Sequence, residues 1–413
     1  MLKILTFSLL YPNEYDPRHG IFVEQRLRKL VESGEVTARV VAPVPWFPFK
    51  SSLFGRYAMY ALVPHSDIRH GIPVLHPRFP SIPKVGMSIG PKLLARAMER
   101  VLRGIIAGGY DFDVIDAHYF YPDGVAAVWL GQALKKPVTV TCRGDDVMYF
   151  SRFRAPRRMM LNAATKAAGI VTVSEDLRRR LGAMGVPPDR VMTLRNGVDT
   201  RLFRPVDRAA VRRSLGLKRP MLLSVGHLVE RKGHHLAIEA LKALPDFDLV
   251  IIGERGTEAG GMVDELYQQV ADFGLTDRVR FLGNLPQEQL RSWYGAADAL
   301  VLATDREGMP NVMLESLACG TPVVATPAGG IPEVMTEPEA GVLIKERTPD
   351  GVVTAVKTLF EHYPDRSETR RFAETLGWEA TTRGQIKLFR RALHESGLGV
   401  ERRGGMTPAA RNC

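Results

Sequence analysis

The chain has 413 residues, 45% of them hydrophobic and 24% charged, which allows two or three globular domains and excludes a disordered or fibrous protein. No run reaches the ~18 consecutive apolar residues of a membrane span, and three scattered cysteines (Cys142, Cys319 and Cys413) predict no disulfide framework and indicate a reducing, cytoplasmic compartment. The net charge of +11 lies in residues 1–200, which hold 28 Lys and Arg against 17 Asp and Glu. Either this charge is scattered and solvated, or it forms a basic face suited to anionic lipid headgroups or a pyrophosphate-bearing acceptor. Nucleic acid is not favoured, because no recognition module is present.

Short apolar runs alternate with helical stretches in the first 200 residues. Strands are predicted in LKILTFS (2–8), ARVVAPV (38–44), FDVIDAHY (112–119), PVTVTCR (137–143) and GIVTVSE (169–175). Between the first two, residues 21–34 predict a helix with Val23, Leu27, Leu30 and Val31 on one face, closed by Gly34. Residues 45–88 interrupt the alternation of strands and helices and are rich in Pro, Arg and aromatic residues, so we interpret them as an insertion.

A second series of strands and helices follows. Strands are predicted in MLLSVGH (221–227), FDLVIIGE (247–254), VRFLG (279–283), ALVLAT (299–304) and TPVVAT (321–326). Helices are predicted at 234–244, 262–274 and 287–297. Apolar strands without polar alternation, interleaved with helices, are typical of parallel sheets covered on both faces.

Two such series predict an α/β protein with two Rossmann-like, doubly wound domains facing a central cleft. We expect an N-terminal domain at 1–200 with the insertion at 45–88, and a C-terminal domain at 201–385. Residues 386–413 are expected to form a C-terminal helix that packs back on domain one, followed by a frayed Gly/Arg-rich tail from Gly397.

The stretch Thr304–Thr326 carries the strongest chemical signal. Glu307 is predicted in a loop and Glu315 in the second turn of a helix that runs from Asn311 to Cys319. Pro310 suits the start of that helix and Gly320 its end. Two hydroxyl-accepting carboxylates therefore flank a helix N-terminus, which attracts phosphate. This pattern predicts a site for a nucleotide sugar.

Eight short motifs occur in a fixed order along residues 1–390. They are GIFVEQ (20–25), DAHYFYPDG (116–124), TCRGDD (141–146), VSE (173–175), NGVD (196–199), VGHLVERKGHH (225–235), FLG (281–283) and EGMPNVMLESLACGTPVVAT (307–326). Together they resemble glycosyltransferase family 4, the retaining nucleotide-sugar enzymes with the GT-B fold. The segment 45–88, with its PWFP and HPR words, resembles the branch that builds cell-surface polysaccharides of the teichuronic-acid type.

The resemblance implies roles for three residues of the second domain. Glu307 resembles the glutamate that contacts the donor hexose near the transferring carbon, and Glu315 the glutamate that holds the ribose. Lys232 resembles the lysine that neutralises the departing diphosphate, an interaction that matters mostly in the transition state. The family commonly has an arginine where His227 stands, so either Arg231 or a protonated His227 is expected to replace it.

The resemblance also implies donor-binding backbone around these residues. Gly308, Met309, Asn311 and Val312 form the loop and helix start beside the phosphates. Gly283 and Leu285 match the turn that holds the base.

Four residues of the first domain complete the predicted site. Gly20 opens a helix where backbone N–H groups approach phosphate. His118 ends a strand and resembles the histidine near the reacting bond. Arg143 and Asp145 stand where the family often has His-Gly-Ser-Asp, near the acceptor. Arg143 either grips an anionic group of the acceptor or forms a structural salt bridge.

The predicted protein is therefore a hexosyltransferase that works without a metal ion, since no spaced Asp pair is present, and without a cofactor besides its nucleotide-sugar substrate, expected to be UDP-linked. The basic first domain and the aromatic residues Trp46, Phe47, Phe49, Phe54, Tyr57 and Tyr60 favour a lipid-linked sugar or polysaccharide acceptor at the inner face of the membrane. Two alternatives remain open, namely a UDP-sugar 2-epimerase-like isomerase and an inactive nucleotide-sugar-binding protein.

Overall fold

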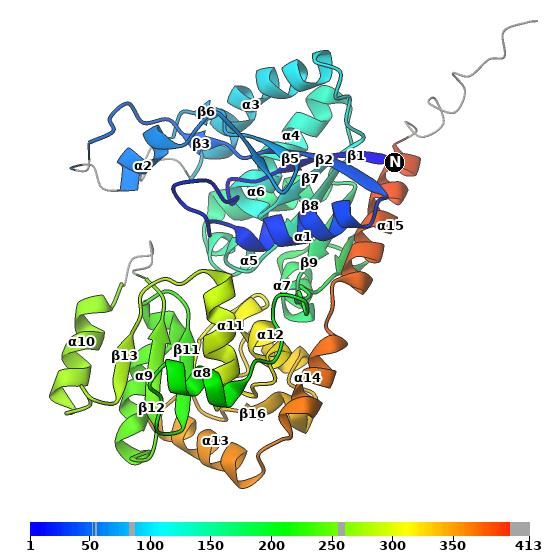
Figure 1. The fold of residues 1–413 in the computed structure, drawn as a ribbon. Coiled ribbons are helices and arrows are strands. Elements are labelled where there is room, and N and C mark those ends of the chain that lie inside the picture. Colours follow the sequence, from blue (N-terminus) through cyan, green and yellow to red (C-terminus); the bar gives the residue numbers. More distant parts are fainter. Residues whose placement is uncertain (52, 54–55, 82–86, 255–260, 397–413) are drawn as a thin grey trace, which may run out of the picture. The chain divides into compact units, whose positions relative to one another are not determined.

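The computed structural model describes all residues except 52, 54–55, 82–86, 255–260 and 397–413 (Figure 1). The chain divides into two compact units. Unit 1 comprises Met1–Arg195 and Glu379–Cys413, and unit 2 comprises Asn196–Trp378. These limits differ slightly from the boundaries predicted at residues 200 and 385. Phe54 and the tail predicted from Gly397 lie outside the described residues.

Unit 1 is built on an eight-stranded sheet with the order β10-β9-β8-β7-β1-β2-β5-β4. Strand β1 pairs in parallel with β7 on one side and β2 on the other. The chain order therefore changes direction at β1, and ligands of open α/β sheets bind at the carboxyl ends of strands flanking such a point. The strands of unit 1 are β1 (Leu2–Phe7), β2 (Val36–Val41), β3 (Val44–Pro45), β4 (Ser66–Arg69), β5 (Ile72–Leu75), β6 (Arg78–Phe79), β7 (Val114–His118), β8 (Val138–Cys142), β9 (Gly169–Thr172) and β10 (Val191–Thr193).

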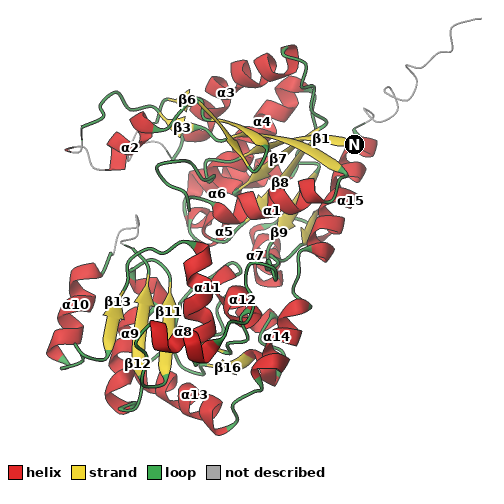
Figure 2. Ribbon diagram, viewed as in Figure 1, coloured by secondary structure: helices red, strands yellow, loops and turns green. Residues whose placement is uncertain are grey.

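Helices accompany this sheet, as Figure 2 shows in red beside the yellow strands. One core cluster joins Ile4 of β1 and Leu27 of the first helix to Ile386 and Phe389 of the last helix. The C-terminal helix thus packs on unit 1, as predicted. The helices of unit 1 are α1 (Ile21–Glu32), α2 (Arg56–Leu62), α3 (Gly90–Ala107), α4 (Val125–Leu134), α5 (Asp145–Met148), α6 (Arg154–Ala164), α7 (Glu175–Met184) and α15 (Glu379–Glu395).

Residues 45–88 contain regular structure that the sequence analysis did not predict. Strands β4 and β5 form an antiparallel hairpin that extends the main sheet beyond β2. His70 and Gly71 both have positive φ in its two-residue turn, the conformation that matches the twist of a tight hairpin. The expectation of purely parallel sheets was therefore wrong at this edge, because a two-residue turn can join only antiparallel strands.

Unit 2 has a six-stranded parallel sheet with the order β13-β12-β11-β14-β15-β16. From β11 the chain adds β12 and β13 toward one edge of the sheet, and from β14 it adds β15 and β16 toward the other edge, so the switch point lies between β11 and β14. The strands are β11 (Met221–Val225), β12 (Asp248–Ile252), β13 (Val279–Phe281), β14 (Ala299–Leu302), β15 (Val323–Ala325) and β16 (Gly341–Leu343). The helices are α8 (Arg208–Ser214), α9 (His234–Ala240), α10 (Val263–Asp272), α11 (Gln287–Ala296), α12 (Asn311–Ala318), α13 (Pro349–Glu361) and α14 (Arg366–Glu374).

Candidate functional site

The candidate donor site of unit 2 lies at the switch point between β11 and β14. Lys232 follows β11 and Glu307 follows β14, and the lysine ammonium forms an ion pair with the Glu307 carboxylate. Thr304 donates a second hydrogen bond to the same carboxylate oxygen, at 3.3 Å. The Lys232 and Glu307 side chains are only 14% and 12% exposed, so solvent screens this pair weakly. The structure thus brings together the two residues predicted to act at the hexose and the diphosphate.

Two glycines allow the loops of this site to approach each other. Gly233 has a φ of 74°, and a Cβ there would lie 2.0 Å from the carbonyl oxygen of Ala303. Gly329 has a φ of 56°, and a Cβ there would lie 1.7 Å from the carbonyl oxygen of Glu307. No other residue fits such contacts. The RKG motif and the GG pair at 329–330 therefore hold the Lys232 and Glu307 loops in place.

Glu315 lies in the second turn of α12 and is 6% exposed. Its Oε2 accepts a hydrogen bond from the Tyr294 hydroxyl at 2.9 Å, and its Oε1 accepts one from the Gln287 amide at 3.4 Å. These two bonds orient the Glu315 carboxylate on the helix. The sequence analysis missed Tyr294 and Gln287, since neither belongs to a motif.

The other residues predicted for the donor surround this centre. Pro310 precedes α12 and contributes no side-chain cap. The Asn196 amide donates a hydrogen bond to the Asn311 side chain at 2.9 Å, so the NGVD motif has a structural role at the start of this helix. Gly308 and Met309 are buried, whereas His227 is exposed. A positive φ of 63° at Gly283 turns the chain after β13, and Gly253 donates to the Gly283 carbonyl at 2.8 Å. Val312, Arg231 and Leu285 are partly buried.

The second candidate site, in unit 1, lies where β1 and β7 end. Gly20 has a φ of 71°, and a Cβ there would lie 2.3 Å from the Leu10 carbonyl group. The glycine is thus required by the backbone of the loop after β1. Ser8 in that loop donates to the His118 carbonyl at 3.3 Å, so the loop and the end of β7 are tied together.

His118 is 1% exposed and both ring nitrogens contact protein groups. Nε2 lies 3.0 Å from Asp116, and Nδ1 lies 2.8 Å from the Arg143 guanidinium. An arginine can only donate, so Nδ1 is the acceptor and Nε2 carries the proton that bonds to Asp116. Burial, reinforced by the charge of Arg143 and opposed by Asp116, lowers the pKa of His118 to about 4. The imidazole is therefore neutral at physiological pH.

Arg143 is 9% exposed and stacks over the Phe22 ring at 5.1 Å. Burial, together with the charge of Arg26, lowers its pKa to about 9. The guanidinium of Arg143 thus bonds to a neighbouring side chain, that of His118. Asp145, by contrast, begins the short helix α5 and is only partly buried.

The buried acid of this motif is Asp146, which the sequence analysis did not single out. Its carboxylate accepts hydrogen bonds from the backbone N–H groups of Phe120, Arg143, Gly144 and Val147. It thereby fixes the loops after β7 and β8. The only sequence signal was the adjacent pair of aspartates, which does not distinguish the structural acid from its neighbour.

Asp116 is part of a buried network that extends from His118 to the C-terminal helix. Thr139 donates to Asp116 at 3.2 Å, and the Gln385 amide of α15 donates to it at 3.0 Å. Arg26 of α1 in turn donates to the Gln385 carbonyl at 2.5 Å. Burial disfavours the charged carboxylate, but His118, Arg26 and Thr139 outweigh it and hold the pKa of Asp116 below its usual value. Neither Arg26 nor Gln385 was predicted. Gln385 and Asp116 are 269 positions apart in the sequence, and no local sequence pattern indicates that such residues will pair in the core.

Comparison with known proteins identifies the family to which this chain belongs. Residues 56–202 match the family model described as Glycosyltransferase Family 4, and residues 207–375 match that of Glycosyl transferases group 1. A D-inositol 3-phosphate glycosyltransferase of Frankia alni is 30% identical over 314 residues, which cover 71% of this chain and 77% of that protein. The chain belongs to glycosyltransferase family 4.

Other relatives of this glycosyltransferase extend the likeness over more of its length. The putative teichuronic acid biosynthesis glycosyltransferase TuaC of Bacillus subtilis is 26% identical, over 87% of this chain and 90% of that protein. Sucrose-phosphate synthase from Thermosynechococcus elongatus has a TM-score of 0.75 at 19% identity and covers 96% of this chain and 100% of its own. Anabaena HepE, solved in complex with UDP, has a TM-score of 0.70 at 18% identity, with the same coverage. The solved structures confirm the predicted GT-B fold.

Two structural observations bear on metals and membranes. Among the described residues of this glycosyltransferase, no group of three or more His, Cys, Asp and Glu side chains is arranged to hold a metal ion. In the same part of the chain, no helix is both long and apolar enough to cross a bilayer.

Proposed function

We propose that this glycosyltransferase moves a hexosyl unit, with retention of its anomeric configuration, from a UDP-sugar to a lipid-linked or polysaccharide acceptor in cell-envelope biosynthesis. The assignment of the nucleotide-sugar donor rests on the ion pair of Lys232 with Glu307 at the switch point of unit 2. The acceptor half rests on the basic, aromatic-rich surface of unit 1.

In the proposed reaction the bond between the anomeric carbon and the diphosphate oxygen breaks, and an acceptor hydroxyl oxygen bonds to that carbon. The acceptor proton passes to the departing diphosphate. Negative charge grows on the diphosphate as it leaves, so a fixed cation there stabilises the transition state more than the ground state. Lys232 supplies that cation and the N-terminus of α12 adds its partial charge, so the departure is proposed to need no metal ion.

Glu307 is proposed to accept hydrogen bonds from the hexose hydroxyls, with its position fixed by Lys232 and Thr304. Glu315 is proposed to hold the ribose, with Tyr294 and Gln287 orienting it. The turn at Gly283 and Leu285 is proposed to hold the base through backbone groups. In unit 1, His118 and Gly20 are proposed to line the donor, and Arg143 and Asp145 the acceptor.

Localisation is proposed to be cytoplasmic, with peripheral attachment to an anionic membrane surface. Four arginines between residues 152 and 158 are exposed at the start of α6, where they are available to lipid headgroups. The described aromatic residues Trp46, Phe49 and Tyr57 are 60%, 55% and 47% exposed, which is unusual for large apolar side chains unless they meet a partner.

A thermal-shift screen of UDP-, GDP- and ADP-sugars tests the donor assignment. A ligand that binds the folded state raises the melting temperature by mass action, and we expect the UDP series to do so. Stabilisation by another nucleotide series would correct the base. Interconversion of the sugar without an acceptor would favour an isomerase, and absence of any nucleotide effect would contradict the proposal.

A further inference from the structure

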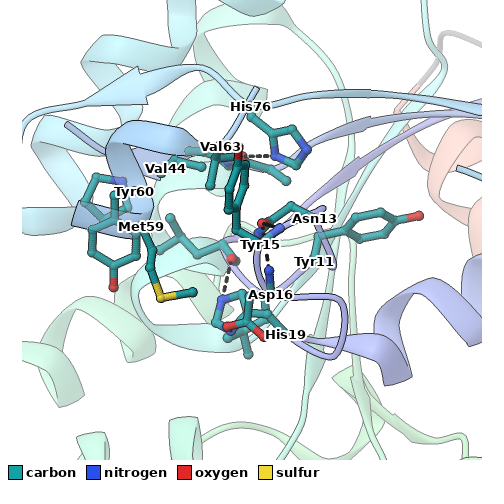
Figure 3. Close-up of a pocket in the computed structure, with 15 residues that line it drawn as sticks. Tyr11, Asn13, Tyr15, Asp16, His19, Val44, Met59, Tyr60, Val63 and His76 are labelled. Carbon is teal, nitrogen blue, oxygen red and sulfur yellow. Dashed lines mark hydrogen bonds and ion pairs between the residues drawn. The ribbon is translucent and has the colours of Figure 1, made fainter. Parts of the chain in front are cut away.

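An apolar pocket lies at the carboxyl ends of three neighbouring strands of unit 1. It has a volume of about 230 Å³ and is shown in Figure 3. Its walls come from the loop after β1, the residues after β2, helix α2 and its C-terminal flank, and the residue after β5. Strand β7, which ends at His118, lies next to β1 in the same sheet. The pocket is therefore near the strand that ends at His118, and all of its lining residues belong to unit 1.

The wall of the pocket is mostly aliphatic and aromatic. Apolar residues line it from every segment except the one after β5, which contributes His76. They are Leu9, Leu10, Val44, Met59, Tyr60 and Val63. Three of the polar side chains there already bond to the protein, whereas the Tyr11 hydroxyl and the Nε2 of His76 are buried without a hydrogen-bond partner among the described residues. Asn13 accepts two backbone hydrogen bonds at 3.0 Å, His19 bonds to the Leu9 carbonyl at 3.1 Å, and His76 bonds to the Ala42 carbonyl at 3.2 Å. The surface offered to a ligand is therefore mostly apolar.

A path of aromatic rings connects this pocket with solvent. Tyr60 lines the pocket and contacts the Tyr57 ring, with centroids 6.0 Å apart. Tyr57 contacts Phe47 at 5.5 Å, and Phe47 contacts Phe49 at 5.9 Å. Tyr57 and Phe49 are exposed, as is Met59 at 36%. Contiguous exposed apolar groups of this kind mark binding sites for apolar partners.

The size and lining of the pocket discriminate between ligands. An engineered apolar cavity of about 150 Å³ stays dry and binds benzene, so a cavity half as large again accommodates a short, branched aliphatic segment. A sugar ring in the same space would leave most of its hydroxyl groups facing carbon atoms without hydrogen-bond partners, which opposes binding. An aliphatic chain has no such groups to satisfy.

We infer that this pocket binds part of the aliphatic chain of a lipid phosphate acceptor, with the rest of the chain passing over the ring path of Tyr57, Phe47 and Phe49. The inference rests on the proposed transfer to a lipid-linked acceptor and names the site that recognises the lipid. The net positive charge of residues 1–200 complements the phosphate of such a molecule.

Calorimetric titration of the full chain below the critical micelle concentration tests this inference. The probes are farnesyl phosphate, dodecyl phosphate and inorganic phosphate. We expect farnesyl phosphate to bind at least ~10-fold more tightly than inorganic phosphate, because the chain buries apolar surface. Equal binding of dodecyl phosphate identifies a general aliphatic site, and weaker binding identifies an isoprenoid site; both support the inference. Equal binding of inorganic phosphate overturns it.

Bulky substitutions locate the bound chain. Val63→Trp and Met59→Trp fill the pocket and should each weaken farnesyl phosphate binding roughly tenfold or more. Met59 is partly exposed, so its variant remains informative if Val63→Trp misfolds. Ile68→Trp is the matched control, because Ile68 is 73% exposed on β4 and does not line the pocket. Unchanged affinity in both pocket variants, or an equal loss in the control, overturns the inference.

The same variants separate this inference from the proposed function. Thermal stabilisation by the nucleotide sugar should persist in Met59→Trp, because the donor residues lie in unit 2. Lipid phosphate binding without any sugar transfer would contradict the proposed function alone. Transfer to an acceptor with no binding of either aliphatic phosphate would contradict the pocket assignment alone.

Discussion

Gln385 donates a hydrogen bond to Asp116 at 3.0 Å across 269 residues of sequence. The chain leaves unit 1 at Arg195, forms the whole of unit 2, and returns with α15 to complete the network behind His118. Asp116 in turn holds the proton of His118 on Nε2 and leaves Nδ1 to Arg143. The C-terminal helix therefore supplies a positioning residue for the β7 end of unit 1, besides its packing.

Replacing Gln385 with leucine tests this positioning role. Asp116 loses one donor and the Nε of Arg26 loses its acceptor, so His118 and Arg143 should shift. If these residues have the proposed roles, we expect kcat/KM to fall roughly 10- to 100-fold, the scale for a small displacement of groups that position the reactants. Nitrogen-15 NMR of the His118 ring should show a changed tautomer or environment.

Leu388→Ala is the matched control on the same helix. Leu388 is buried against Gly169, so its truncation should lower the melting temperature by creating a cavity. It removes no hydrogen bond of the network, and the His118 signal should stay unchanged. An altered signal in Leu388→Ala, or an unaltered one in Gln385→Leu, would mean that Gln385 only packs.

Glu315 is predicted to act on binding rather than on turnover. A ribose contact is the same in the ground and transition states, so Glu315→Ala should raise the donor dissociation constant and change kcat little. Gln287→Ala serves as the milder comparison, because it removes only a 3.4 Å hydrogen bond to the same carboxylate. If turnover collapsed while donor affinity held, Glu315 would belong to the chemistry instead.

Asp123 gives the fold a dependence on pH. Its Oδ2 accepts hydrogen bonds from the Leu9 N–H and the Ser8 hydroxyl, and burial raises its pKa to about 8. The unfolded carboxyl titrates near 4, so the folded state binds more protons between these values. The stability that this group contributes is present below pH 4 and is lost as the pH rises through about 8.

Asp123→Asn removes this titration and keeps a neutral acceptor. We expect its melting temperature to fall less than that of the wild type between pH 6 and pH 9. Parallel curves for the two proteins over this range would show that Asp123 is ionised in the folded state.

The basic surface of unit 1 should control membrane binding. Binding to anionic vesicles should fall steeply with salt, because each basic residue near the surface contributes ~1 kcal/mol that salt screens. Charge reversal of the exposed arginines near the start of α6 should weaken vesicle binding and spare hydrolysis of the donor. These residues are Arg152, Arg154, Arg157 and Arg158.

The matched control reverses exposed cations of unit 2. These residues are Arg201, Arg204, Arg213 and Lys218. We expect this variant to bind vesicles as the wild type does. Equal losses in the two variants, or binding that ignores salt, would mean that the unit 1 charge only aids solubility.

The strands and helices that the sequence predicted correspond to elements of the structure because each carries its own apolar pattern. Several others were not predicted, among them α3, α4, α13, β10 and β16. The Thr304–Thr326 stretch likewise predicted α12 and its flanking glutamates from local signals, namely a proline before the helix and a glycine after it. The two-residue hairpin at His70 and Gly71 was missed, because its turn has no Asn-Gly or Asp-Gly pair and its strands are short.

Residues whose role depends on distant partners were not predictable from pattern. In the sequence, Gln385 and Arg26 look like ordinary polar residues on the surface of a helix. Both are 1% exposed, because Arg26 bonds to Gln385 and Gln385 bonds to Asp116. Tyr294 reads as a core aromatic, and its hydroxyl contact with Glu315 arises only when α11 and α12 pack together. Such roles follow from tertiary contacts that no local signal encodes.

The rate at which the protein releases the nucleoside diphosphate from its best donor tests the central claim most directly. Glu307→Ala and Lys232→Ala should each lower this rate at least ~10²-fold without unfolding the chain, the scale for one preorganised electrostatic group. Lys242→Ala, which removes an exposed lysine of unit 2 paired with Glu239, should leave it unchanged. Near-wild-type rates in the Glu307 and Lys232 variants would contradict the assignment of this ion pair to the transfer reaction.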